Sequence, residues 1–157
     1  MNEMTEGSDA PNIALPADNG NMMSVQDLNG QQVVLYFYPK DDTPGCTKEA
    51  IAFTAFLEQF ADQNTAVLGV SPDTVIKHGK FKAKHDLGVT LLADEDHELA
   101  NAYGVWVEKN MYGRKYMGIE RSTFLIDKTG KIAKIWRKVK VAGHAEVVLQ
   151  EATVLNS

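Results

Sequence analysis

The strongest constraint on the fold is the passage from an apolar run into a helical pattern around the only cysteine of the chain. The run from Val33 to Tyr38 predicts a strand that is buried on both faces, as in a parallel sheet. From Pro44 to Asp62 the apolar spacing becomes helical. The inward face of this helix would comprise Cys46, Ala50, Phe53, Leu57 and Phe60. Cys46 is therefore expected in the first turn, on the buried side.

A thiol in that position has chemical consequences. Pro44 suits the first helical position, and Thr43 suits the N-cap. The unpaired N–H groups and the dipole of a helix start favour the thiolate, which is the reactive form. Making a free thiol mostly ionised at neutral pH takes about 2.7 kcal/mol, whereas a helix end supplies about 0.3–1 kcal/mol. The sequence therefore predicts a cation near Cys46.

The order of the other elements predicts the fold class. We expect a helical turn near Ser24, an irregular loop over residues 104–119, and a strand pair either side of Asp127-Lys128-Thr129-Gly130. The remaining elements are strands at 65–70 and 89–92 and helices at 74–86, 97–103 and 144–155. Strands and helices that alternate, then a closing hairpin and helix, indicate an α/β, thioredoxin-like fold with a central mixed β-sheet flanked by helices.

Composition narrows the possible functions. The length of 157 residues fits one domain, 1–157, with residues 1–12 expected to be a flexible lead-in. A net charge of −5 argues against nucleic-acid or membrane partners, and no stretch resembles a spanning helix or a signal peptide. One cysteine cannot form an internal disulfide, which fits a reducing compartment, so we expect a cytoplasmic protein.

The segment around Cys46 resembles the peroxidatic motif of the peroxiredoxins. The motif elements are Pro39-x-x-x-Thr43-x-x-Cys46, within a longer Thr-Pro-Gly-Cys-Thr-x-Glu-Ala string. This string is most similar to the branch called bacterioferritin comigratory protein or peroxiredoxin Q. Further matches lie at residues 69–73, 92–94 and 118–127, so the resemblance extends from about residue 7 to the C-terminus.

The resemblance implies a thiol peroxidase that reduces hydrogen peroxide and organic hydroperoxides. By position, Cys46 would be the nucleophile, and Thr43 would hydrogen-bond the peroxide and the thiolate. Pro39 would shield the site, and Arg121 would be the required cation. Glu49 matches an acidic position that helps to orient this arginine.

The chain departs from much of that branch at Ile51, where many members carry a resolving cysteine. We therefore predict a single-cysteine mechanism in which an external thiol reduces the Cys46 sulfenic acid. The reductant would be a thioredoxin, a glutaredoxin or a small thiol. The branch suggests a monomer, and no cofactor or metal is expected, because the four histidines lack metal-ligand spacing.

Simpler interpretations remain for the same residues. Cys46 alone could be a buried hydrophobe, Arg121 a surface charge, Thr43 a helix cap and Glu49 a solvated carboxylate. The aromatic residues Tyr103, Trp106 and Tyr112 either line the substrate mouth or pack structurally. A disulfide reductase lacks its C-x-x-C pair here, and a hydrolase lacks an assignable base. The non-enzymatic alternative is a redox sensor or partner-binding module on a thioredoxin-like fold.

Overall fold

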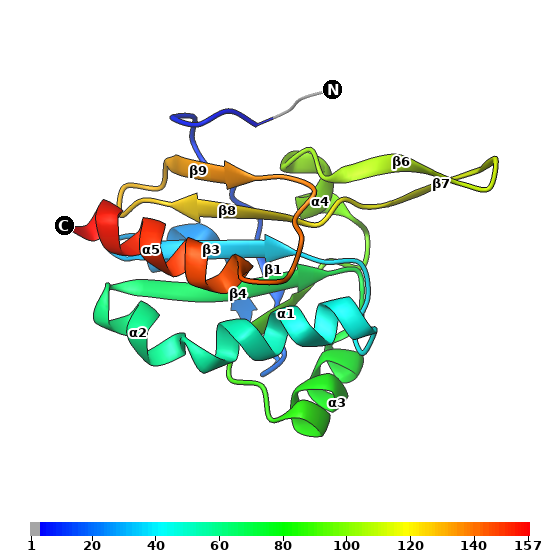
Figure 1. Ribbon diagram of the computed structural model, residues 1–157, viewed down its shortest axis with the longest axis horizontal. Helices are drawn as coiled ribbons and strands as arrows, with labels where there is room; N and C mark the ends of the chain where they lie inside the picture. Colours follow the sequence, from blue (N-terminus) through cyan, green and yellow to red (C-terminus); the bar gives the residue numbers. More distant parts are fainter. Residues whose placement is uncertain (1–3) are drawn as a thin grey trace.

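The computed structural model describes residues 4–157, and a mixed five-stranded sheet lies at its centre (Figure 1). The strand order is β5-β4-β3-β8-β9. β3 pairs in parallel with β4, and β4 with β5, whereas β8 runs antiparallel to both β3 and β9. These strands are β3 (Gln32–Phe37), β4 (Thr65–Ser71), β5 (Thr90–Ala93), β8 (Ser122–Ile126) and β9 (Ile132–Trp136). The expected α/β class with a mixed sheet is confirmed.

Helices cover both faces of this sheet. One face carries α1 (Pro44–Ala55), α2 (Leu57–Asp62), α3 (Val75–His85) and α5 (His144–Asn156). The other face carries α4 (Glu98–Ala102), the 3-10 turn η1 (Val25–Leu28) and the short pair β1 (Leu15–Pro16) and β2 (Met22–Met23). None of the helices within residues 4–157 is long and apolar enough to span a bilayer.

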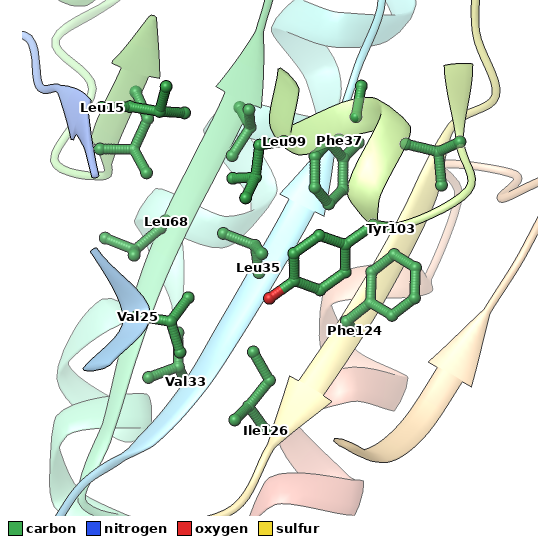
Figure 2. Packing of buried hydrophobic residues seen from close by; sticks show 14 of the residues in the cluster. Leu15, Val25, Val33, Leu35, Phe37, Leu68, Leu99, Tyr103, Phe124 and Ile126 are labelled. Atoms are coloured by element: carbon green, nitrogen blue, oxygen red, sulfur yellow. The ribbon is translucent and has the colours of Figure 1, made fainter. Parts of the chain in front are cut away.

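The central strand β3 explains why both faces must be covered. Its side chains alternate between the two cores: Val33, Leu35 and Phe37 enter one, and Val34 and Tyr36 enter the other. Figure 2 shows the first core, where Phe37 packs against Tyr103 and Phe124. Cys46 belongs to the second core, together with α1 residues Ala50 and Phe53. The reactive-thiol candidate thus sits at the rim of a packed hydrophobic layer.

The prediction of an irregular loop over residues 104–119 is wrong. The segment is a projecting antiparallel hairpin of β6 (Trp106–Met111) and β7 (Arg114–Ile119) (Figure 1). Its two-residue turn, Tyr112-Gly113, has positive φ at both positions (53° and 79°), the geometry that matches strand twist. Turns of this kind usually carry Asn-Gly or Asp-Gly, whereas a tyrosine rarely adopts positive φ. The Tyr112-Gly113 pair therefore did not indicate a hairpin turn in the sequence.

Two further expectations differ from the structure. The helix predicted over residues 44–62 is two helices, because the backbone leaves the α-helix at Phe56, with φ −104° and ψ 7°. The expected lead-in lies partly outside the described residues. Its later part bonds to the β8–β9 turn: Gly7 donates to the carbonyl of Ile132, and Ala10 donates to that of Gly130.

Candidate active site

The first turn of α1 places Cys46 where the sequence predicted it. Thr43 is the N-cap, with extended φ and ψ, and Pro44 is the first helical residue. The first backbone bond of the helix runs from the Thr47 N–H to the Thr43 carbonyl. The amides of Gly45 and Cys46 precede this bond and have no carbonyl within the helix. The Cys46 side chain is 2% exposed, so its sulfur is almost fully shielded from solvent next to these N–H donors.

Arg121 crosses from the sheet to this helix start and supplies the cation. Its Nη2 donates to Cys46 Sγ over 3.3 Å, and its Nη1 donates to Glu49 Oε1 over 2.6 Å. Gly45 permits this approach, since a Cβ at that position would lie 3.3 Å from Nη2. One planar guanidinium therefore bridges the sulfur and a carboxylate that lie 75 and 72 residues away along the chain.

Glu49 is not the solvated carboxylate of the simpler interpretation. It is 1% exposed, and its Oε2 has no hydrogen-bond partner among residues 4–157. Burial raises its pKa to about 7, although the Arg121 guanidinium opposes that shift. Burial lowers the pKa of the Arg121 guanidinium, the Glu49 charge raises it, and the pKa rises overall. Arg121 therefore stays charged across the physiological range, whereas Glu49 does not.

Thr43 and Pro39 lie in the segment between β3 and α1, and the Thr43 side chain does not cap the helix. The Thr43 hydroxyl makes no capping bond to α1 and instead donates to the Lys40 carbonyl at 2.9 Å. Its lone pairs remain available to accept a hydrogen bond. Pro39 follows β3 by two residues and is half-buried. Both residues thus belong to one short loop that leads from the sheet to Cys46.

A buried polar network anchors that loop, and sequence analysis missed it. Asp41 accepts hydrogen bonds from Tyr38 and His78, both at 2.6 Å, and its backbone N–H donates to Asp73 at 2.7 Å. The second His78 nitrogen contacts the Leu92 carbonyl at 2.9 Å. Both ring nitrogens therefore lie against oxygen atoms, so the His78 ring is held at both ends.

The carboxylates of Asp41 and Asp73 and the His78 ring lie close enough together to hold a metal ion. Their ligand atoms, however, already bond one another or neighbouring groups. Burial raises the pKa of Asp73, but hydrogen bonds from the Asp41 backbone N–H, from Ser71 and from Lys77 lower it, and the pKa falls overall. The arrangement acts as a structural clasp between the active-site loop and α3. Only the three-dimensional fold brings Asp41 and His78, 37 residues apart, into contact.

The remaining candidates are structural. Tyr103 is fully buried and donates to the Pro11 carbonyl, and Trp106 stacks on His97 with ring centroids 3.7 Å apart. Tyr112 is at the exposed hairpin tip. His144 lies near Arg121 and bonds the Thr123 hydroxyl. Burial, then the Arg121 charge, lowers the pKa of His144 to about 4, so this ring is neutral at neutral pH.

Comparison with protein families places this geometry in context. The model of the AhpC/TSA family matches residues 7–135. The peroxiredoxin Bcp of Bacillus subtilis is 53% identical over 144 residues, covering 92% of each chain. A putative peroxiredoxin of the same name from Coxiella burnetii is 54% identical over 143 residues, covering 90% of this chain and 95% of that one.

Solved structures give the same result for the fold. A mutant of PrxQ from Xylella fastidiosa superposes with a TM-score of 0.92 at 42% identity, covering 98% of both chains. The bacterioferritin comigratory protein of Xanthomonas campestris, studied for alkyl peroxide reduction, gives 0.89 at 43% identity over 92% of both. These neighbours confirm the expected thioredoxin-like fold and the resemblance drawn from the motif around Cys46.

Proposed function

Because this chain belongs to the AhpC/TSA family, among the bacterial peroxiredoxins named Bcp, we propose that Cys46 is its peroxidatic nucleophile and that it turns over without a second cysteine. The chain is a thiol-dependent peroxidase. A single observation supports this assignment of roles: the only cysteine of the chain lies in the first turn of a helix, and its sulfur accepts a hydrogen bond from the Arg121 guanidinium.

In the oxidative step, the Cys46 thiolate attacks the terminal, hydrogen-bearing oxygen of the hydroperoxide, and the O–O bond breaks. The sulfur becomes a sulfenic acid, and the other oxygen leaves as hydroxide or alkoxide, which then takes a proton. Negative charge moves from sulfur to the leaving oxygen during this step. Arg121 and the free amides of Gly45 and Cys46 are positioned to stabilise that charge. The Thr43 hydroxyl accepts a hydrogen bond from the O–H group of the hydroperoxide and aligns the O–O bond with the sulfur.

The reductive step needs an external thiol. Ile51 stands where many branch members carry the resolving cysteine, and this position is exposed on α1. The donor thiol attacks the sulfenic sulfur, releases water and leaves a mixed disulfide with Cys46. A second donor thiol then attacks the donor sulfur and restores the Cys46 thiolate. Reduction before a second peroxide arrives prevents the sulfinic acid from forming.

Peroxide consumption tests these roles when it is measured with a panel of donors: thioredoxin, glutaredoxin and small thiols. We expect turnover with at least one donor, and none in the Cys46→Ser variant, which should remain folded because serine is nearly isosteric. Turnover by Cys46→Ser would remove Cys46 from the mechanism. We further propose that the protein acts as a monomer in the cytoplasm, in line with the reducing conditions that its donors require.

A further inference from the structure

The hairpin β6–β7 carries an unusual side-chain face on the segment that precedes Arg121 in the chain. In the register Lys109↔Tyr116 and Met111↔Arg114, opposed residues share one face of the ribbon. Met111 and Tyr116 are exposed there, at 55% and 42%. Together with Tyr112 and Arg114 they line an open hollow of roughly 510 Å³. We call the set Lys109, Met111, Arg114 and Tyr116 the hairpin face.

The inner end of this face lies against the segment that leads to Arg121. The Lys109 stem lies across Gly118, where a Cβ would come within 3.2 Å of Lys109 Cδ, and the chain then continues to Arg121. Burial and then Arg121 lower the pKa of Lys109, whereas Glu120 and Cys46 oppose the shift. The charges of Arg121 and Cys46 thus both act on Lys109. The hairpin and the start of α1 lie at the same end of the molecule (Figure 1).

The charge of the hairpin is opposite to that of the whole chain. Residues 106–119 contain three cationic residues and one acidic residue, whereas the protein carries a net charge of −5. Within residues 4–157, Lys109 and Arg114 make no ion pair. Exposed methionine, tyrosine and arginine side chains are typical of the centre of a protein interface. A face of this kind fits a protein partner with an acidic, partly apolar surface.

Resting on the proposed single-cysteine mechanism, we propose that the hairpin face docks an acidic dithiol protein and presents its thiol to the Cys46 sulfenic acid. The partner supplies both electrons: one of its thiols forms the mixed disulfide with Cys46 and releases water. Its second thiol then breaks that bond and leaves the partner as a disulfide. A small neutral thiol reaches the same sulfur without using the hairpin face.

Two matched pairs of variants on the same hairpin test this proposal. Met111→Ala and Arg114→Gln alter the hairpin face, whereas Met117→Ala and Lys115→Gln remove the same kinds of group from the opposite face. The probe is thioredoxin, kept reduced by its reductase and NADPH. We expect the KM for thioredoxin to rise about fivefold in the first pair and to stay unchanged in the second. Added salt should raise the KM for thioredoxin more in the wild type than in Arg114→Gln, because the variant has lost one of the charges that salt screens.

Two other measurements separate this proposal from the proposed function. Stopped-flow oxidation by hydrogen peroxide and turnover with dithiothreitol should be equal in all four variants and the wild type. Loss of peroxide oxidation in the wild type would instead refute the proposed function. Equal KM values across both pairs, or a wild type reduced by dithiothreitol but not by thioredoxin, would overturn the docking proposal. So would a hairpin-dependent dimer in sedimentation, which would assign this face to a second copy of the chain.

Discussion

Arg121 is the residue through which the charges of the site are coupled. Its two guanidinium nitrogens donate to Cys46 and Glu49, so one side chain both contacts the sulfur and is held in place by a carboxylate. A lysine could provide the charge but not the two-pronged geometry. Local patterns located Cys46 in the first turn of a helix and predicted a cation near it. Only the family resemblance assigned that cation to Arg121, because nothing local to residue 121 indicates a partner 75 residues away.

Replacing Arg121 by alanine should slow the reaction of reduced protein with hydrogen peroxide by about 10²–10³-fold. The reason is that the leaving oxygen loses its strongest donor. The rate of Arg121→Lys should lie between the rates of Arg121→Ala and the wild type. Stopped-flow fluorescence at neutral pH measures the rate, and Arg114→Ala, an exposed arginine of β7, is the control. An unchanged rate in Arg121→Ala would remove the guanidinium from the mechanism.

The Thr43 hydroxyl should also be needed for full peroxidase activity. It donates to the Lys40 carbonyl, so a valine would lose both that bond and the acceptor offered to the peroxide. Thr43→Ser keeps the hydroxyl and should retain most peroxidase activity, whereas Thr43→Val should lose at least about tenfold. Steady-state kcat/KM for hydroperoxide compares them. Equal activity of the two variants would show that the hydroxyl is dispensable.

At the scale of elements, the loop between β3 and α1 is the part that must be held still. Pro39, Thr43 and Cys46 succeed one another over eight residues, and the Asp41–His78 contact fastens this loop to α3. Sequence patterns located the strand and the helix, because a run of six apolar residues and a helical apolar spacing are strong local signals. The clasp and the β6–β7 hairpin depend on tertiary contacts and on an unusual turn, which local patterns do not carry.

Removing the clasp should therefore affect both stability and catalysis. His78→Leu leaves the buried Asp41 carboxyl without one of its hydrogen-bond partners, which we expect to cost about 1–3 kcal/mol in the free energy of unfolding. The peroxide reaction should also slow, because the loop loses its anchor. Urea unfolding and stopped-flow oxidation measure the two effects. His85→Gln is the control, because its partner Asp42 is exposed. A folded His78→Leu protein with the wild-type rate would contradict a positioning role.

At the scale of the whole molecule, one sheet with a core on each face links every element described above. We propose that residues 1–157 form one thioredoxin-like domain and unfold in one cooperative step. The residues that we propose to be catalytic lie in the second core and at its rim, where burying a charged group costs stability. Functional sites commonly retain such destabilising groups. Glu49 is the clearest case here.

Glu49 should make the protein less stable as the pH rises. Its folded pKa of about 7 exceeds the ordinary value of 4.5, so the folded state binds the proton more tightly. The stability that this provides is complete below about pH 4.5 and is lost as the pH rises through 7. Between pH 5 and pH 8 the loss amounts to roughly 2–3 kcal/mol. His144, with its lowered pKa, acts in the opposite direction, so only a comparison of variants isolates Glu49.

The comparison is Glu49→Gln against the wild type, with chemical denaturation at pH 5 and pH 8. The variant should gain stability relative to the wild type at the higher pH, and its peroxide reaction should be slower because Arg121 is held less firmly. Glu58→Gln, on the partly exposed helix α2, is the control and should show neither effect. A pH-independent difference between Glu49→Gln and wild type would contradict the raised pKa.

The central claim is that one sulfur, Cys46, carries the whole oxidative step as a sulfenic acid. Intact mass spectrometry of reduced protein after one equivalent of hydrogen peroxide, with a sulfenic-acid trap present, tests it most directly. The account predicts a rapid gain of one trap adduct at Cys46 in the wild type, and a much slower gain in Arg121→Ala. Rapid loss of peroxide with no adduct at Cys46, or equally fast labelling of both proteins, would contradict it.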